Sequence, residues 1–320
     1  MFGDFRAHLK LLPSEIEANR KPILLNLRES YDYCMGLFSL HARSFHFASR
    51  YLDQEERRSI AALYGFCRLA DDFADEINLP KDRLEQELGI LRDLVTQLAG
   101  GEVFHNPLFD AFGDTLRKYK IPVKYLYDLI DGVQMDLNLT EIQTVKELDK
   151  YCYHVASTVG IMMCHIWRRV EPQTLERAAD LGHAMQLTNI LRDVSEDYDN
   201  GRIYIPLETR HDFRVDTSDF ESRVVGPNFK RLLTHEIHRA RSFYARAEIG
   251  EQDLPPGAAF TIKVAGRVYS AIMTEIEKMD YQVFRRRAVV PKWKKLWIAQ
   301  QLRSEYKREK KHYERMVLEE

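Results

Sequence analysis

The sequence predicts an all-α protein, and three observations favour this fold class. The chain of 320 residues has only 15 glycines and 11 prolines, and chains poor in both are more often helical than all-β. No proline occurs between Pro22 and Pro80, between Pro122 and Pro172, or between Pro256 and Pro291, which suits helices because an interior proline breaks them. Within these stretches apolar residues recur every three or four positions, as one face of a helix requires.

The three-to-four-residue period predicts where each helix lies, and turn-forming residues predict where it ends. An apolar stripe over residues 148–166 predicts one helix, and a similar stripe over 175–185 predicts the next. Turn formers at Gly100-Gly101 and Asn200-Gly201 mark helix ends. The expected helices lie near residues 26–50, 54–76, 82–99, 107–119, 124–138, 146–168, 173–198, 217–247, 257–284 and 294–316.

The chain has no internal repeat, low-complexity linker or mid-chain change of composition, so a single domain over residues 1–320 is expected. Its basic amphipathic tail, at about 292–320, is the exception. Twelve lysines and arginines lie from Arg285 to Arg315, and they are interleaved with the apolar residues Trp293, Leu296, Trp297, Ile298 and Leu302. Two interpretations stay open: a solvated terminal helix, or a helix that rests on an anionic membrane surface.

The charge balance and the cysteines exclude several classes of protein. A net charge of −2 gives no reason to expect nucleic-acid binding. The longest apolar run, 155–167, falls short of the ~20 residues that a membrane span needs. The four cysteines form no zinc-binding spacing, and the first residues have no apolar signal-peptide core. The expected compartment is the cytoplasm, with peripheral contact to the inner face of the membrane as the tail's second interpretation.

The first acidic cluster is Asp71-Asp72-Phe73-Ala74-Asp75. At about 100° per residue on a helix, Asp71 and Asp75 differ by roughly 40°, and Tyr64 and Arg68 lie within about 60° of Asp71. One helix face therefore carries a tyrosine, an arginine and two carboxylates.

The second cluster has Gln186, Asn189, Asp193 and Asp197 at positions i, i+3, i+7 and i+11 of an otherwise apolar helix. On one continuous helix these four lie inside an arc of about 80°. Carboxylates stacked on one helix face repel each other. A hard divalent cation explains the arrangement, because Mg²⁺ takes one or two carboxylates from a protein together with substrate phosphate oxygens.

Two other motifs fail on these residues. A calcium loop built around Gly201 would place Tyr198 and Leu207 where oxygen ligands belong. No Walker-type or GxGxxG glycine pattern occurs. The two acidic faces therefore predict a Mg²⁺–diphosphate site, with Mn²⁺ as an alternative ion.

Four blocks of sequence resemble the squalene/phytoene synthases, the head-to-head prenyl transferases of the all-α class I isoprenoid-synthase fold, a helical bundle around a central cavity. The blocks are residues 41–48 (HARSFHFA), 62–72 (ALYGFCRLADD), 151–160 (YCYHVASTVG) and 184–193 (AMQLTNILRD) continuing to 201–206 (GRIYIP). A weaker fifth block covers 268–288. Ser157 departs from the family, which usually has glycine there.

The resemblance implies a role for each matching residue. It implies metal ligation by Asp71, Asp72, Asp75, Asn189, Asp193, Glu196 and Asp197. It implies diphosphate contact or shaping of the first reaction site by Arg43, Tyr64, Arg68, Tyr151, Gln186, Arg192, Tyr269 and Arg286. It implies prenyl-chain tunnels lined by Phe45, Val155, Val159 and Gly160.

The implied reaction joins two prenyl diphosphates, expected to be geranylgeranyl diphosphate, through a cyclopropyl diphosphate intermediate to a phytoene-type hydrocarbon. Alternatives are a squalene, dehydrosqualene or presqualene diphosphate synthase acting on farnesyl diphosphate, with NADPH as cofactor only for squalene. A non-catalytic scaffold member of the family is a remote alternative, because every carboxylate is present here. A chain-elongating prenyl transferase would repeat DDxxD at its second site, and residues 193–197 do not.

The carboxylates also suggest an expectation about stability. If Asp71, Asp75, Asp193 and Asp197 face one cavity, their charges repel one another when no metal is bound. Replacing Asp193 by Asn should then leave the metal-free melting temperature unchanged or higher. A structural salt bridge predicts the opposite, with Asp193 paired to a cation such as Arg192 or Arg202.

Overall fold

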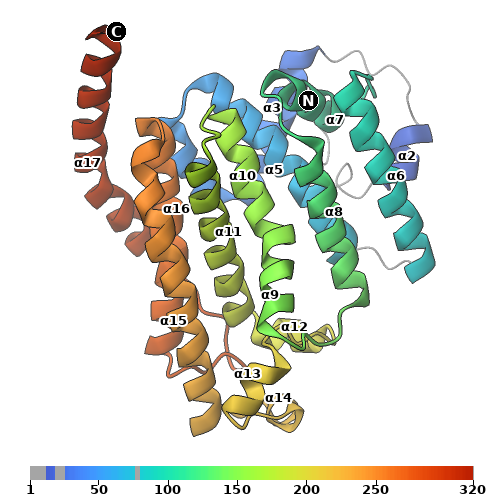
Figure 1. The fold of residues 1–320 in the computed structure, drawn as a ribbon, viewed down its shortest axis with the longest axis vertical. Coiled ribbons are helices and arrows are strands. Elements are labelled where there is room, and N and C mark those ends of the chain that lie inside the picture. Colours follow the sequence, from blue (N-terminus) through green and yellow to red (C-terminus); the bar gives the residue numbers. More distant parts are fainter. Residues whose placement is uncertain (1–11, 19–25, 76–79, 320) are drawn as a thin grey trace. The chain divides into compact units, whose positions relative to one another are not determined.

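A computed structural model describes residues 12–18, 26–75 and 80–319 and confirms the all-α prediction (Figure 1). Within these residues the β-type pairing is confined to an isolated parallel bridge between Glu141 and Ile203. The helices group into two compact units, residues 1–138 with 161–170, and residues 139–160 with 171–320. The expectation of a single domain stays a prediction.

The first unit is built from seven helices and part of an eighth within the described residues. These are α2 (Pro13–Ala18), α3 (Leu27–His41), α4 (Arg43–Ala48), α5 (Gln54–Asp75), α6 (Lys81–Gly100), α7 (Pro107–Lys118), α8 (Val123–Asn138) and the end of α10 (Thr158–Ile166). Its core lies where α3, α5 and α7 pack together. There the buried rings of Phe66 and Phe112 stack with their centroids 4.4 Å apart.

The second unit is arranged around one central helix, α11 (Pro172–Arg192). The other elements are α9 (Val145–Cys152), the π-helical segment η2 (Tyr153–Ser157), the start of α10, α12 (Val194–Asp199), α13 (Leu207–Asp212), α14 (Thr217–Ser222), α15 (Pro227–Ile249), η3 (Gly250–Asp253), α16 (Pro256–Lys278) and α17 (Lys292–Glu319). Helix α11 packs against α15, α16, α9 and η2. Helix α11 therefore lies at the centre of the second unit, and the candidate site residues of this unit lie on it or on elements near it.

Local chemistry explains where several helices begin and end. Asn26 and Thr144 form capping boxes at the starts of α3 and α9, because each side chain accepts from a backbone N–H that has no helical partner. Asn106 caps α7, and Pro107 follows at the first helical position, where its missing N–H costs nothing. Gly101 ends α6 with a left-handed φ of 99°, which glycine adopts without steric strain.

Five of the predicted helices are interrupted or end earlier in the structure than the sequence predicted. The segment 26–50 is two helices and a short 3₁₀ turn, and 217–247 is divided where Pro227 starts a new helix. The segment 257–284 ends at Lys278, and Asp280 and Tyr281 follow with positive φ angles. The segment 146–168 contains η2, and the segment 173–198 is interrupted at Asp193. Sequence periodicity also missed α2 and α13.

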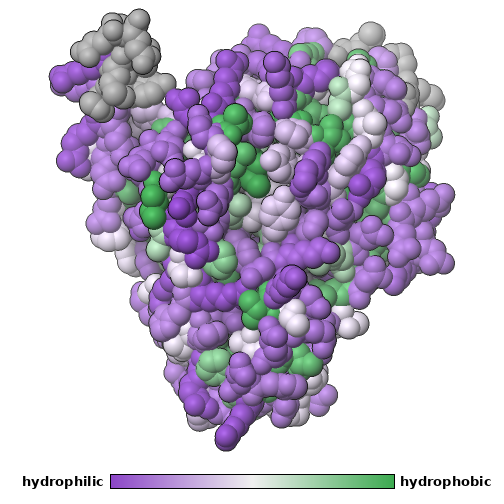
Figure 2. All heavy atoms as spheres, viewed as in Figure 1, coloured by the Kyte–Doolittle hydropathy of each residue, from purple (hydrophilic) through white to green (hydrophobic). Residues whose placement is uncertain are grey.

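Polar residues cover much of the face shown in Figure 2, with apolar residues scattered among them. No helix in the described part of the chain is both long and apolar enough to cross a membrane. The four cysteines, Cys34, Cys67, Cys152 and Cys164, are buried free thiols, as expected for core residues.

Candidate functional site

The second acidic cluster lies at the junction of α11 and α12, where Asp193 leaves the helical conformation with φ −105° and ψ 15°. The predicted single helix over 173–198 is therefore wrong at this point. The backbone N–H of Asp193 still donates to Asn189 at 2.9 Å, and that of Asp197 donates to Asp193 at 2.8 Å. Hydrogen bonds of the helical type thus connect three of the four predicted polar residues across the interruption.

Two arginines hold the Asp193 carboxylate. Arg192 Nε donates to Asp193 Oδ1 at 2.8 Å, and Arg287 Nη2 donates to Asp193 Oδ2 at 2.9 Å. Arg287 Nη1 also lies 3.6 Å from Oε2 of Glu196. The metal-free carboxylate is therefore compensated by cations, and the expectation of uncompensated repulsion at Asp193 is wrong. Arg192, one of the two cations that the sequence suggested for a salt bridge, contacts Asp193 here.

Arg192 connects this carboxylate to α16. Burial alone would lower the pKa of the Arg192 guanidinium, but the hydrogen bonds and charge of Asp193, with a further hydrogen bond to Tyr269, raise it. Arg192 therefore carries a stable positive charge although its side chain is only 18% exposed. Tyr269 was predicted for the site, and the structure places it beside Arg192.

The side chains near Asp193 carry oxygen atoms that can serve as ligands for a hard cation. The Asn189 amide nitrogen donates to Gln186 Oε1 at 3.2 Å. The side-chain oxygen of Asn189, Oδ1, is buried and accepts no hydrogen bond among the described residues. A buried acceptor without a partner is costly, and a bound water or ion can supply the missing contact. Asn189, Asp193 and Glu196 thus fit the oxygen chemistry of Mg²⁺.

The first acidic cluster lies in the last turn of α5, in the first unit. Asp71 is exposed there, and Arg68, one turn earlier, is half-buried. The side chains of Asp72, Asp75 and Arg43 lie outside the described part of the structure. Their predicted roles therefore stay predictions.

Aromatic residues of the first unit meet around one buried ring. The centroid of Phe38 lies 5.3 Å from that of Tyr64 and 5.7 Å from that of Phe45. Tyr64 and Phe45 come from α5 and α4, so the structure brings two predicted site residues from different helices to the same ring.

Tyr151 stacks on Tyr204, with ring centroids 5.0 Å apart and an interplanar angle of 29°. Tyr204 is held by the short pairing between 140–142 and 203–207, in which Ile142 N donates to Ile203 O at 3.0 Å. Tyr151 is only 4% exposed. Its ring therefore has a fixed orientation, which a residue that shapes a reaction site needs.

Residues 153–160 cross α11 at very short distance. A Cβ atom on Gly182 of α11 would lie 2.5 Å from the carbonyl oxygen of Ala156, and one on Gly160 would lie 2.6 Å from that of Ala178. Only glycine fits at either position, because the obstructing atoms belong to the backbone. The π-helical segment thus rests directly on α11, and π-helical turns are frequent at functional sites. Val155 and Val159, predicted to line a prenyl tunnel, are half-buried in this region.

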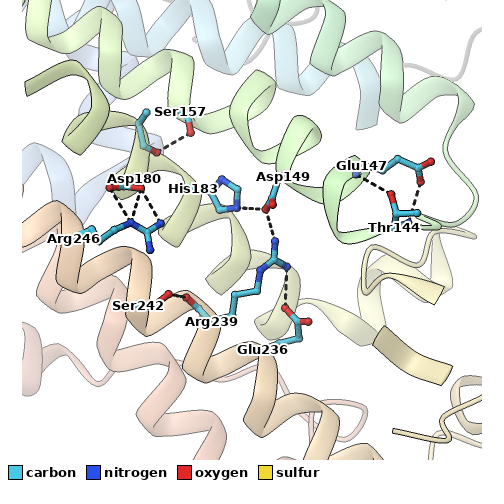
Figure 3. A network of polar contacts seen from close by, with 11 residues as sticks. Thr144, Glu147, Asp149, Ser157, Asp180, His183, Glu236, Arg239, Ser242 and Arg246 are labelled. Carbon is cyan, nitrogen blue, oxygen red and sulfur yellow. Dashed lines mark hydrogen bonds and ion pairs between the residues drawn. The ribbon is translucent and has the colours of Figure 1, made fainter. Parts of the chain in front are cut away.

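A network of polar contacts ties the same crossing to α15 (Figure 3). Asp149 Oδ1 lies 2.9 Å from Nε2 of His183 and also binds Arg239, which lies 3.3 Å from Glu236. Burial alone would raise the pKa of Asp149, but His183 and Arg239 outweigh it and lower the pKa. The network therefore keeps Asp149 ionised. It joins α9, α11 and α15 at Asp149, two positions before Tyr151 in α9.

Ser157, the departure from the family pattern, adds a further bond to this crossing, since its Oγ donates to Ala179 O at 2.7 Å (Figure 3). We expect Ser157→Ala to lose about 1 kcal/mol of folding free energy, because the Ala179 carbonyl loses a partner in a buried place. Thermal unfolding should show a melting temperature lower by about 2–4 °C. Ser304→Ala, on the exposed side of α17, is the control and should melt like the wild type. Equal melting of both variants would contradict a structural role for this bond.

The sequence missed two contacts of the candidate site. Arg287, for which no role was predicted, contacts Asp193, while Arg286, predicted to contact diphosphate, is exposed and its role stays a prediction. Tyr204 supports Tyr151, although its block was recognised without a role for it. The run of three arginines at 285–287 was a signal for a cation near the acidic cluster, but it could not indicate which arginine contacts Asp193.

Comparison with known proteins defines the class. The squalene/phytoene synthase family model matches residues 39–294. A phytoene synthase from Arthrospira platensis is 34% identical over 281 residues, covering 84% of this chain and 90% of that protein. A 4,4'-diapophytoene synthase from Staphylococcus haemolyticus is 32% identical over 283 residues, covering 88% and 99%.

A solved dehydrosqualene synthase, in complex with a ligand, has the same fold with a TM-score of 0.81. It is 26% identical and covers 88% of this chain and 98% of its own. The all-helical fold and these similarities define a prenyltransferase enzyme. The chain belongs to the squalene/phytoene synthase family.

Proposed function

We propose that the protein condenses two molecules of geranylgeranyl diphosphate head to head, through a cyclopropyl diphosphate, to a phytoene-type hydrocarbon with release of two diphosphates. The observation that carries the proposal is the Asp193 carboxylate bound by two arginines, with the buried side-chain oxygen of Asn189 one helical turn earlier in the second acidic motif. The similarity to phytoene synthases of 34% identity over 84% of the chain supports the choice of product.

The proposal assigns metal and diphosphate binding to both acidic segments. Asp71, Asp72 and Asp75 of α5, and Asn189, Asp193, Glu196 and Asp197 of the α11–α12 junction, would hold Mg²⁺. When bound, Mg²⁺ supplies Lewis-acid neutralisation of the charge that develops on a leaving diphosphate.

The chain's own residues supply the remaining functions. Arg192 and Arg287 offer planar guanidinium groups that can bind phosphate oxygens with two hydrogen bonds each. An aromatic ring such as that of Phe45 would present a π face that stabilises an allylic cation. Val155 and Val159 would exclude water, so that the cation reacts with the second prenyl double bond.

A shorter substrate is the second candidate. The relative from Staphylococcus haemolyticus is named a 4,4'-diapophytoene synthase, and the structure with a TM-score of 0.81 is a dehydrosqualene synthase. These similarities favour farnesyl diphosphate as the alternative substrate, with dehydrosqualene as product, or squalene if NADPH donates hydride.

The product assay distinguishes these candidates. The purified protein is incubated with Mg²⁺ and either farnesyl or geranylgeranyl diphosphate, with and without NADPH, and the hydrocarbon is identified by mass spectrometry. We expect phytoene from geranylgeranyl diphosphate, formed equally well without NADPH and abolished by EDTA. A reduced product that requires NADPH, or a product from farnesyl diphosphate alone, would replace the proposal by the second candidate. If neither substrate gave a hydrocarbon, the product would be examined for the cyclopropyl diphosphate: its presence would indicate a presqualene diphosphate synthase, and its absence would favour the scaffold alternative.

A further inference from the structure

Helix α17 has two faces with different surroundings, and one of them packs on α16. Ile298, Ala299 and Leu302 are buried there, each less than 10% exposed. Ion pairs fix the register at both ends of this contact. Lys294 lies 2.8 Å from Glu275, and Lys263 lies 2.7 Å from Glu309. The two helices therefore run side by side in opposite directions (Figure 1).

The opposite face of α17 begins with large apolar side chains that are exposed. Trp293 is 68% exposed, Leu296 59% and Trp297 54%, and Val289 just before the helix is 66% exposed. At about 100° per residue, the three helical side chains share an arc of roughly 100° that points away from the buried face. Four exposed apolar residues thus lie within nine positions of the chain, and exposed apolar patches mark interaction sites.

The charges around this patch are positive. The exposed cations that continue this side of α17 are Arg303, Lys307, Arg308 and Lys311. The two acidic residues between Lys292 and Lys311, Glu305 and Glu309, both lie within 4.0 Å of Lys263 on α16. The acids thus lie on the packed face, and the outward face combines tryptophan with uncancelled positive charge.

We propose that Val289, Trp293, Leu296 and Trp297 form a docking patch that inserts into the surface of an anionic lipid bilayer. Tryptophan rings favour the boundary between headgroups and acyl chains, and basic residues beside them are attracted to acidic headgroups. A second copy of the chain fits less well, because a two-fold contact would bring the same cations against each other.

This inference sharpens the expectation for the basic tail. The sequence placed membrane contact anywhere within 292–320 and grouped Ile298 and Leu302 with the tryptophans. The structure buries those two residues on α16, so the contact is assigned to 289–297, with cations of 303–311 assisting. The docking proposal does not depend on which hydrocarbon the enzyme makes.

The test measures binding of the full-length protein to vesicles without substrate. One set of vesicles is phosphatidylcholine alone, and the other contains equal parts of phosphatidylcholine and phosphatidylglycerol. We expect co-sedimentation with the anionic set, weakened by high salt, and a blue shift of tryptophan fluorescence. The shift reports the patch because the third tryptophan, Trp167, is already buried.

The variant Trp293→Ser/Trp297→Ser should bind anionic vesicles about tenfold or more weakly, because it removes the inserted rings. The control is Val224→Ser, since Val224 is 60% exposed elsewhere in the second unit, and it should bind like the wild type. Equal binding by the double variant and the wild type would overturn the proposal. So would absence of vesicle binding together with a change of oligomeric state in the double variant, which would identify a protein interface instead. Because no substrate is present, either result is independent of the product assay.

Discussion

Asp193→Asn is expected to lower the rate of hydrocarbon formation by about a hundredfold or more, because metal-assisted departure of diphosphate accounts for several kcal/mol of the barrier. Unlike the expectation from sequence, the structure predicts that the same change also lowers the metal-free melting temperature. Arg192 and Arg287 both donate to the Asp193 carboxylate, and Asn leaves them without a compensating anion. Since Arg287 is 52% exposed, solvent reduces this cost to about 1–2 kcal/mol.

Two measurements separate the roles of Asp193. Melting in EDTA reports the loss of the arginine contacts. Melting with Mg²⁺ and diphosphate reports ligand binding, because a ligand that binds only the folded state stabilises it by mass action. The wild type should gain stability from the ligands and the variant should not.

The matched control is Asp199→Asn in the same acidic segment. Asp199 pairs with Arg223 at the surface, where both side chains are more than 40% exposed, and exposed pairs contribute little. It should retain activity and ligand stabilisation. If Asp193→Asn melted lower but kept its activity, Asp193 would be a structural salt-bridge partner, and the metal assignment would be abandoned.

Gly182→Ala is expected to destabilise the protein by roughly 3 kcal/mol. The added methyl group would lie 2.5 Å from the Ala156 carbonyl oxygen and 2.7 Å from the Ser157 Cα. These are backbone atoms of η2, so relief requires the two helical segments to separate. The melting temperature should fall by about 6–12 °C. Activity should fall as well, because Val155 belongs to the displaced segment and Tyr151 lies two positions before it.

Gly89→Ala provides the control for this substitution. Gly89 lies in the interior of α6, and a Cβ there meets no atom within 4 Å. Alanine should therefore stabilise the protein, by up to about 1 kcal/mol, because it restricts the unfolded chain and favours the helix. If the two variants shifted the melting temperature in the same direction and by similar amounts, the close crossing of η2 and α11 would be refuted.

Much of the fold was predictable because helix formation depends on residues that are close together in the sequence. The predicted segments 54–76, 82–99, 107–119 and 124–138 match α5 to α8 to within a residue, since apolar period, prolines and caps all act within a few residues. Interruptions were not predictable. The apolar stripe over 148–166 is the same whether or not the helix contains the π-helical turn η2. Likewise, no residue near Asp193 in the sequence indicates that the backbone leaves the helical conformation there.

The candidate site was predictable in composition but not in its charge balance. Matching motifs named Asn189, Arg192, Asp193 and Tyr269, and the structure places these four residues near one another. The second arginine on Asp193 comes from 94 positions later in the chain. Such a contact depends on how α16 and the turn after it return to α11, which no local pattern contains.

The sequence by itself therefore determined the helices, the family and the residue types of the acidic motifs, because each depends on near neighbours or on matching motifs. Only the tertiary structure decided which charges meet and which faces are covered. It paired Asp193 with two arginines, which reverses the expected effect of Asp193→Asn on metal-free stability. It also buried Ile298 and Leu302 against α16 while leaving Trp293 and Trp297 exposed. The physical reason is that charge compensation and burial depend on residues distant in the chain, whereas helix formation depends on adjacent ones.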